Sequence, residues 1–344
     1  MKRDRFFSIV EKYPEITLCL VGDFCLDRYL EINSSLNEIS IETDLTVYNV
    51  TNVRAQPGGA GTILNNLQAL GIGKVIPSGF VGKDGEGAEL MAALEKIDCV
   101  DWSYDTFIQT EKRRTFTYCK PLLCKGNATP KELNRFDFKN WDPTPNEVTQ
   151  HLCSKMQSGL EHSQGVILLD QVDAPDTGVI QRQILDSVRL ALKNRVIDHS
   201  LSDSRKRIIE FEGIGIKVNK EEFSEWHKVE NPDLISPENW EKVISDYTEV
   251  LSQPIFVSLS EHGIIGKDKN GAICRCKSQP IRGEIDIVGA GDCTTANLIL
   301  ALAAGAQFHE AMEIAMAAAS VVIHKLGTTG TASVKEIEEK LFGD

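Results

Sequence analysis

Short apolar runs separated by amphipathic stretches recur along this chain. Residues 16–21, ITLCLV, form a continuous apolar run with the length and composition of a buried parallel strand. Similar runs lie at 165–170, 195–198, 213–219 and 254–260, with helical stretches between them. This alternation predicts an α/β fold with a doubly wound, mostly parallel sheet, right-handed crossovers and flanking helices.

Two segments interrupt the alternation with a different pattern. Residues from about 31 to 53 are polar and β-branched, and residues 102 to 138 again favour strands over helices. We expect these two insertions to form a small β-rich lid beside the main sheet. The sequence holds no internal repeat and no low-complexity linker. We therefore expect residues 1–344 to form a single domain with this lid.

The stretch IDIVGAGD, residues 285–292, joins an apolar run of strand character to an apolar helix that should end at Gly305. The first turn of a helix carries free N–H groups and a partial positive charge, so it attracts anions. Gly289 and Gly291 let a ligand approach those N–H groups closely. From the residues alone, Asp292 is either the N-cap of this helix or a chemically active group beside a bound anion.

Polar side chains follow most of the predicted strands. They are Asp23 and Asp27 after the first strand, then Asp170, Asn219, Ser258, Ser260 and Asp292 after later ones. In doubly wound sheets, ligands bind outside the carboxyl ends of the strands. We therefore expect these residues to meet in one site at that edge of the sheet.

Charge and composition narrow the class of protein. The formal net charge is -13 and no long basic run occurs, which argues against nucleic-acid and membrane partners. No apolar stretch approaches the roughly 18 residues of a membrane span, and the first residues lack the apolar core of a signal peptide. We therefore expect a cytoplasmic protein.

Several common kinds of site are missing from the sequence. The nine cysteines include no C-x-x-C pair, so we expect reduced thiols rather than disulfides or a zinc site. Neither a G-x-x-x-x-G-K-[ST] motif nor an H-E-x-x-H motif occurs. This absence argues against a P-loop enzyme and a zinc protease.

Seven motifs resemble, in order and spacing, those of the ribokinase-like (PfkB) sugar kinases: VGDFCLD, PGGAG, VGKDGEG, DSR, KVNKEEF, VSLSEHGIIG and DIVGAGD. The resemblance extends over essentially the whole chain. LDRYL, PGGAG and LNRFDF are most similar to the kinase domain that phosphorylates heptose phosphate in lipopolysaccharide core synthesis. The resemblance implies a ribokinase-like phosphotransferase that moves the γ-phosphoryl group of ATP to a hydroxyl of a sugar or sugar phosphate.

The resemblance also implies roles around Asp292. Asp292 falls on the catalytic base, and the N–H groups of Ala290, Gly291 and Asp292 fall on an anion hole for the transferred phosphoryl group, with Gly289 directly before them in the same catalytic motif. A positioned base accepts the proton of the attacking hydroxyl, which is worth roughly 100- to 10,000-fold in rate.

A second set of residues matches the family's sugar site. Asp27 falls on the carboxylate that binds sugar hydroxyls, and Gly58 and Gly59 let the backbone approach the sugar. Thr62 stands where the family usually has an asparagine, so the chain departs from the family at a residue beside the sugar. Without the resemblance, Asp27 is equally an exposed carboxylate at a strand end.

A third set matches the family's nucleotide and magnesium site. Asn219 and Glu222 match an N-x-x-E motif that organises Mg²⁺ and phosphate, with Glu222 holding Mg²⁺ through water. The alternative is that they only form a turn and a helix start. The residues that match a loop near the ATP phosphates are Ser258, Ser260 and Gly263.

Other matches are less complete. Asp286 matches an aspartate linked to a monovalent-cation (K⁺) site in some relatives, although Ile287 replaces the usual threonine beside it. Asn297 replaces a small residue in the following helix. The basic runs at 112–114 and 205–207 are either solvated surfaces or a subsite for a substrate phosphate.

Two other functions stay open from the sequence. One is a nucleoside kinase on the same fold, which favours aromatic residues in the lid. The other is a non-catalytic sugar-binding regulator, which has no need of the base. Because small lids expose sheet edges, we also expect a homodimer that pairs through the lid.

Overall fold

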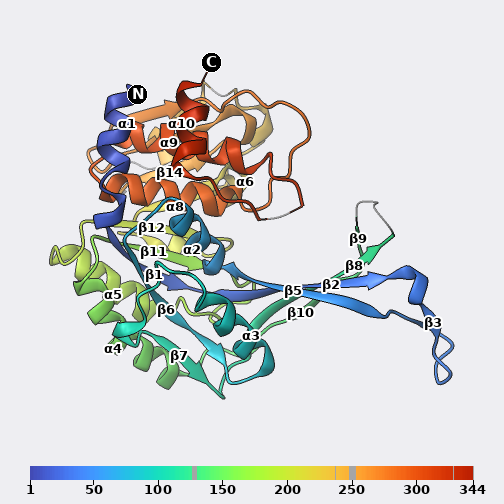
Figure 1. The fold of residues 1–344 in the computed structure, drawn as a ribbon. Helices are drawn as coiled ribbons and strands as arrows, with labels where there is room; N and C mark the ends of the chain where they lie inside the picture. The colour runs from blue at the N-terminus through green and yellow to red at the C-terminus, as the bar shows by residue number, and fades with distance from the viewer. Residues whose placement is uncertain (126–129, 237, 248–252, 328, 344) are drawn as a thin grey trace.

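The computed structural model describes residues 1–344 except 126–129, 237, 248–252, 328 and 344 (Figure 1). A nine-stranded sheet forms its centre, parallel except for two antiparallel strands at one edge. The strands in spatial order are β16 (Ile273–Cys276), β15 (Ile264–Lys267), β14 (Ile255–Ser258), β13 (Ile216–Asn219), β12 (His199–Ser204), β11 (Gly165–Asp170), β1 (Thr17–Gly22), β6 (Lys74–Gly82) and β7 (Phe107–Thr110).

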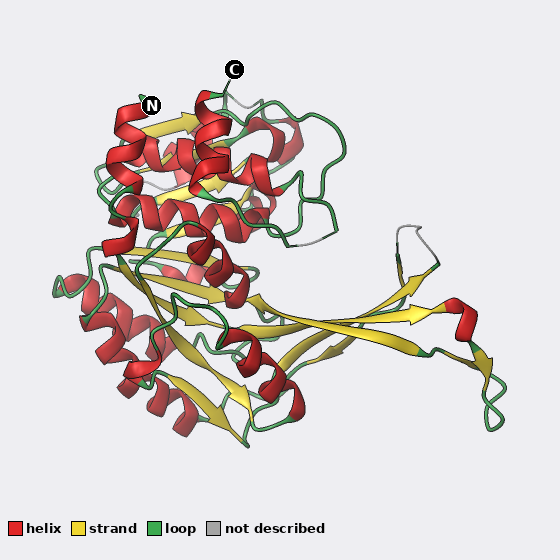
Figure 2. Ribbon diagram, in the orientation of Figure 1, coloured by secondary structure: helices red, strands yellow, loops and turns green. Residues whose placement is uncertain are grey.

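Helices cover both faces of this sheet (Figure 2), as a doubly wound fold requires. Leu18 and Leu20 of β1 share one core with α1 (Arg3–Val10), α2 (Ala60–Ala69), α3 (Gly85–Leu94), α8 (Ala290–Ala303), α9 (Phe308–Val322) and α10 (Val334–Phe342). Cys19 and Val21 point to the opposite face of the sheet. They share a second core with α4 (Asn146–Glu161), α5 (Arg182–Lys193), α6 (Lys220–His227) and α7 (Trp240–Tyr247). The predicted doubly wound, mostly parallel fold is confirmed.

A second, smaller sheet projects from the body as a long blade (Figures 1 and 2). β2 (Phe24–Asn33) follows β1 almost directly and pairs with β5 (Val50–Gly59) on one side and β8 (Phe116–Cys124) on the other. The strands that complete this blade are β9 (Lys131–Glu132) and β10 (Phe136–Phe138), and a hairpin of β3 (Glu38–Ile39) and β4 (Thr46–Val47) lies beyond its outer end.

The blade differs from the predicted lid in its boundaries. It begins at Phe24 instead of residue 31, and residues 107–110 belong to the main sheet, where β7 pairs in parallel with β6. The ring of Phe107 packs edge-to-face against Phe24, with centroids 5.0 Å apart. This apolar contact holds the start of the second insertion against the body, so the insertion enters the blade only at Phe116.

Two predicted strands are wrong. Residues 195–198 form a turn because Arg195 has a left-handed backbone conformation (φ 55°), and β12 begins only at His199. Residues 285–288 form a loop, and Ile287 and Val288 are 73% and 56% exposed. Ile285 and Ile287 line a cavity beside this loop, which explains their apolar character without a sheet.

Candidate active site

Helix α8 begins at Ala290, and Gly289 caps it with a left-handed backbone conformation (φ 82°) that favours glycine. Asp292 lies in the first turn, but no side chain caps this helix end. The interpretation of Asp292 as a simple N-cap is therefore wrong. The Ala290 N–H donates to the Ile287 carbonyl at 3.2 Å, so the N–H groups of Gly291 and Asp292 are the ones that this turn offers to an anion.

Asp292 has an unusual pKa for a carboxyl group. Desolvation and the nearby Asp203 carboxylate raise its pKa to about 7, against the opposing charges of Lys217 and Arg205. The negative charge of Asp27 also raises the pKa of Asp292. The predicted sugar-binding carboxylate therefore lies within electrostatic reach of Asp292. A carboxyl with this pKa can take up a proton near neutral pH, as a general base must.

A buried ion pair lies beside the start of α8. Lys217 of β13 and Asp203 of β12 are 2.8 Å apart, and Thr295 of α8 donates to the same Asp203 oxygen at 3.2 Å. A Cβ placed on Gly291 would lie 3.1 Å from the Lys217 ammonium. The side chain of Lys217 thus adds a full positive charge next to the N–H groups of the α8 turn. Asp203 keeps the pKa of Lys217 raised despite burial.

Asp27 lies inside β2, on the blade, rather than at the end of β1. Its carboxylate is packed over Gly58, where a Cβ would lie 2.8 Å from Oδ2, so only glycine leaves room there. Lys120 of β8 pairs with Asp27 at 3.1 Å, and both side chains are mostly buried. The interpretation of Asp27 as an exposed strand-end carboxylate is therefore wrong.

The other two predicted sugar-site residues lie where β5 meets α2. Gly59 has a left-handed conformation (φ 57°), and a Cβ there would overlap the carbonyl oxygen of Asp23. Thr62 is buried in the first turn of α2, with 5% of its surface exposed. Gly59 thus allows the sharp turn from blade to body.

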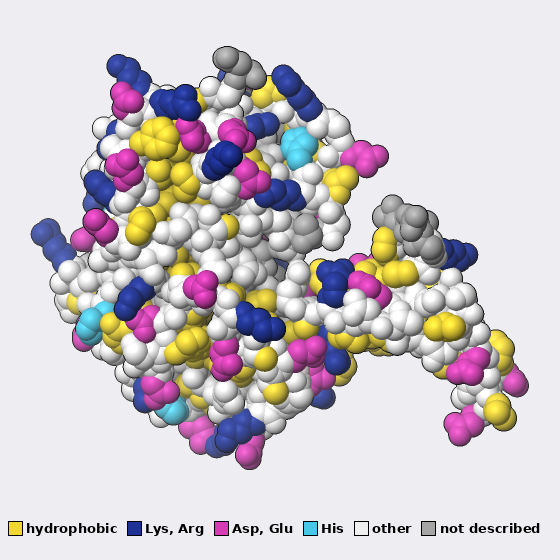
Figure 3. All heavy atoms as spheres, viewed as in Figure 1, with side chains coloured by type: hydrophobic (Ala, Val, Ile, Leu, Met, Phe, Trp, Pro, Cys, Tyr) yellow, Lys and Arg dark blue, Asp and Glu magenta, His cyan; other side chains and the backbone are white. Residues whose placement is uncertain are grey.

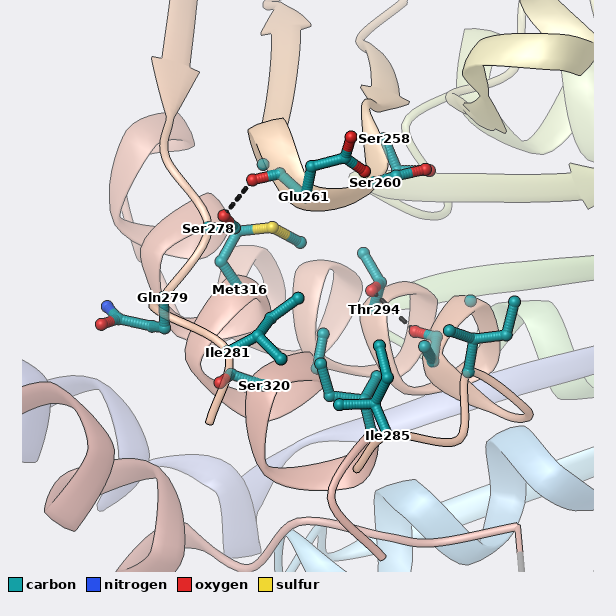
Figure 4. A pocket seen from close by; sticks show the side chains of 16 residues that line it. Ser258, Ser260, Glu261, Ser278, Gln279, Ile281, Ile285, Thr294, Met316 and Ser320 are labelled. Carbon is teal, nitrogen blue, oxygen red and sulfur yellow. Dashed lines mark hydrogen bonds between the residues drawn. The ribbon is translucent and has the colours of Figure 1, made fainter. Parts of the chain in front are cut away.

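A cavity of about 280 Å³ lies beside the start of α8 (Figure 4). It brings together five residues that the sequence predicts near the nucleotide or the anion hole: Ser258, Ser260, Gly263, Ala290 and Gly291. The remaining wall is mainly apolar and is built by Ile281, Ile285, Ile287, Met316, Ala319 and Ile323, together with a few polar side chains. A flat apolar group can occupy this space while phosphates reach the helix N-terminus.

Asn219 and Glu222 form a capping box at the start of α6. The Asn219 side chain accepts from the Glu222 N–H at 2.7 Å, and the Glu222 carboxylate accepts from the Asn219 N–H at 2.8 Å. The helix-start interpretation is thus confirmed. Desolvation and Asp203 raise the pKa of Glu222. No group of three or more His, Cys, Asp or Glu side chains suited to a metal occurs among the described residues.

Asp286 ties two loops together instead of pointing freely into solvent. Its carboxylate accepts from the N–H groups of Val288 at 3.0 Å and Gly327 at 3.2 Å. These bonds hold the loop before α8 against the turn after α9. The monovalent-cation role of Asp286 stays a prediction.

Each basic run has one buried residue. Arg113 is buried and donates to the carbonyl of Thr177, and Arg207 is buried in an ion pair with Asp170 at 2.8 Å. The solvated-surface interpretation is wrong for these two residues, whereas the other members of both runs are exposed. Arg205, in contrast, is exposed at the carboxyl end of β12.

Three charged residues of this site had no role predicted from the sequence: Asp203, Lys217 and Lys120. One of them was visible in the pattern, because Lys217 stands in the strand between Ile216 and Val218. A lysine in a buried strand needs a partner for its charge. When it also lies at the carboxyl end of the sheet, where ligands bind, a functional role is expected.

The geometry agrees with the comparison to known proteins. The sequence profile of the pfkB family carbohydrate kinases matches residues 18–335. The chain belongs to this family. Among curated PfkB relatives, the bifunctional protein HldE of Bradyrhizobium sp. (strain ORS 278) is 27% identical over 340 residues, 98% of this chain and 66% of the relative. The HldE of Aliarcobacter butzleri is 29% identical over 336 residues, 96% of this chain and 65% of the relative. The chain thus spans slightly under two thirds of these proteins.

Solved PfkB-type structures share the fold. Arabidopsis thaliana ribokinase complexed with ribose and ATP has a TM-score of 0.67 at 18% identity, covering 95% of this chain and 98% of that one. Phosphofructokinase-2 from Escherichia coli in complex with potassium has a TM-score of 0.70 at 18% identity, covering 94% and 97%. The predicted ribokinase-like fold is confirmed. No helix in the described part of the chain is long and apolar enough to cross a membrane.

Proposed function

We propose that this protein transfers the γ-phosphoryl group of ATP to a hydroxyl of a sugar or sugar phosphate, with Asp292 as the general base. The observation that carries this proposal is the position of Asp292. It follows the two residues of the α8 turn that line the apolar cavity, and the charge of Asp27 on the blade acts on it. A nucleotide in the cavity and a sugar at Asp27 would meet there.

In this mechanism, Asp292 accepts the proton of the sugar hydroxyl as its oxygen attacks the γ-phosphorus. The bond from that phosphorus to the β–γ bridging oxygen breaks, and ADP leaves with the electron pair. The N–H groups of Gly291 and Asp292 and the Lys217 ammonium stabilise the negative charge on the transferred group. Asp292 then releases its proton to solvent, which its pKa near 7 makes easy.

ATP would place its base against the apolar wall and its phosphates toward Ser258, Ser260 and the α8 turn. Mg²⁺ would be held through water by Glu222, whose carboxylate already accepts the Asn219 N–H. When bound, this ion supplies charge neutralisation between the β- and γ-phosphates. A monovalent cation at Asp286 is a further expectation for this site.

The acceptor would bind at the Asp27 carboxylate, which is packed over Gly58. A buried carboxylate that accepts from two sugar hydroxyls rejects analogues that lack one, because its oxygen is left unpaired. Thr62 offers one donor where an asparagine amide offers two, so we expect it to change which sugar fits. The resemblance to HldE over nearly the whole chain makes a heptose phosphate the acceptor to test first.

We also propose a homodimer that forms through the blade. β5 lies at an edge of the small sheet, and Figure 3 shows apolar side chains at its outer end. The exposed apolar side chains there are Leu36, Ile39, Ile41, Leu45, Tyr48, Val50 and Val53. A second copy would cover both the edge and these side chains. Sedimentation that shows a monomer at micromolar concentration would contradict this dimer.

The direct test of the proposed function is ADP release in the presence of Mg²⁺ and a panel of matched acceptors. The panel holds ribose, fructose and a heptose, the phosphate ester of each, and adenosine. We expect turnover with at least one sugar or sugar phosphate and none with adenosine. ADP release that no member of the panel stimulates, or that adenosine alone stimulates, contradicts the proposal.

A further inference from the structure

Arg205 follows β12 directly and acts electrostatically on two parts of the candidate site. Its charge lowers the pKa of Asp292 and of Glu222, which belong to the phosphoryl side. It also lowers the pKa of Asp173 and acts on Tyr118, which belong to the loop after β11 and to the blade. One exposed guanidinium is therefore shared by the region of the transferred phosphoryl group and the wall around the acceptor.

The guanidinium of Arg205 is uncompensated by a carboxylate. Among the residues that the structure describes, no carboxylate oxygen lies within 4.0 Å of it. Three cations on or beside the blade differ in this respect. Lys120 pairs with Asp27, Arg135 with Asp137, and Lys139 with Asp137 and Asp173.

Although it is exposed, Arg205 is held in place. The amide oxygen of Gln171 accepts from its Nε at 3.2 Å and its Nη2 at 2.5 Å, the orientation that these two donors require. The Gln171 N–H in turn donates to Asp23 Oδ2 at 2.9 Å, and the Val179 N–H donates to Asp23 Oδ1 at 2.7 Å. Asp23 is completely buried at the end of β1. A neutral amide therefore orients the guanidinium without cancelling its charge.

The loop that carries Gln171 is braced along its whole length. Arg207 donates to the Asp176 carboxylate and the Ile180 carbonyl, and Arg113 donates to the Thr177 carbonyl. These contacts explain why Arg113 and Arg207 are buried although their neighbours in the two basic runs are exposed. They fix residues 171–180, so the position of Gln171 is set before any ligand binds, and little ordering is needed on binding.

We propose that Arg205 binds the phosphate group that the acceptor already carries, and that Gln171 and Asp23 are its positioning residues. The proposal rests on the proposed function and names the acceptor class as a phosphorylated sugar. A guanidinium presents a planar fork of N–H donors that matches phosphate oxygens. The transferred phosphoryl group already has a cation in Lys217, whereas Lys120, Arg135 and Lys139 are paired with aspartates. Arg205 has no such partner and is oriented by a neutral amide, so its charge is available to compensate a second phosphate.

The test measures binding by calorimetry with a non-hydrolysable ATP analogue present. The probes are fructose and fructose 6-phosphate, ribose and ribose 5-phosphate, and a heptose with its phosphate. We expect the wild type to bind at least one phosphate ester about tenfold or more tightly than its parent sugar. In Arg205→Gln this preference should fall by about tenfold or more, while the affinity for the parent sugar stays the same.

Three further variants sharpen the result. Gln171→Ala keeps the charge but removes its support, so the preference should fall several-fold. Arg205→Lys should keep part of the preference, because it retains the charge without the fork. Arg182→Gln removes an equal charge from α5, where the side chain is 91% exposed, and should change nothing. Thermal unfolding checks that each variant is folded.

Several outcomes would overturn this inference. They are an Arg205→Gln protein that keeps the preference, an equal weakening of sugar and phosphate ester, and a wild type without preference. Equal losses of kcat on sugars and phosphate esters would instead assign Arg205 to the transferred group. Each of these leaves the proposed function intact if Asp292→Asn still abolishes turnover. Absence of turnover with every acceptor contradicts the proposed function, while the binding preference still tests Arg205.

Discussion

The proposed nucleotide and acceptor sides of the site are built from different chemistry. The nucleotide side is lined mainly by apolar side chains of α9 and of the loop before α8, with backbone groups of Ala290 and Gly291 at its inner end. The acceptor side is charged and paired: Asp27 lies 3.1 Å from Lys120, and Lys139 lies 2.9 Å from Asp173.

This difference indicates where specificity lies. An apolar wall selects ligands mainly by shape, and a small chemical change in the ligand lowers its binding affinity only a little. A half-buried charged wall discriminates far more strongly, because a missing hydroxyl leaves a charged group unpaired. We therefore expect selection among acceptors to reside on the blade side and nucleotide binding to depend on the volume of the cavity.

The largest effect is expected where the two sides meet. Lys217→Met should lower kcat by about 100-fold or more, with both KM values nearly unchanged, since it removes charge stabilisation from the transferred group alone. Steady-state kinetics measure this, and Lys217→Arg, which keeps the charge, should recover part of the rate. A Lys217→Met protein that is folded by thermal unfolding yet retains kcat within about threefold would remove Lys217 from the mechanism.

On the acceptor side, Asp27→Ala should raise the acceptor KM by about 100-fold and leave the ATP KM within about twofold. The matched control is Glu31→Ala, farther out on the same strand, where Glu31 pairs with Arg54 at 2.7 Å. That control should change neither KM. An Asp27→Ala protein with an unchanged acceptor KM would show that the blade side does not recognise the acceptor through this carboxylate.

On the nucleotide side, Ala319→Phe should fill part of the cavity and raise the ATP KM by about tenfold, with the acceptor KM unchanged. Ala92→Phe introduces the same phenyl ring on the exposed side of α3 and serves as the control. Equal rises of both KM values in Ala319→Phe would mean that the two sides are not separate, which contradicts the comparison.

The sequence predicted the parallel sheet and most candidate residues because these features are local. Apolar runs mark buried strands, and the glycines around Asp292 mark a helix start that approaches a ligand. The loop at 285–288 was predicted wrongly for the same reason: an apolar run has the same pattern whether it enters a sheet or lines a cavity.

The ion-pair partners of the site residues could not be predicted from short stretches of sequence. Lys217 and Asp203 stand on neighbouring strands, and nothing in either segment indicates that they pair. Arg205 and Arg207 are two residues apart in one basic run, yet one is exposed and the other is buried against Asp170. Only the packing of the loop after β11 decides between these two environments.

The central claim, that Asp292 is the general base, is tested most directly by the pH dependence of kcat/KM for the acceptor. A base must be deprotonated to act, so activity should rise with pH through an apparent pKa of about 7. Burial also raises the pKa of Asp23 to about 7. The same pH profile is therefore measured for Asp23→Asn, which should leave the rising limb of the profile at the same pH. Asp292→Asn should lose nearly all turnover. A limb near the ordinary carboxyl pKa of about 4, or a limb near 7 that disappears in Asp23→Asn while Asp292→Asn stays active, would contradict the account.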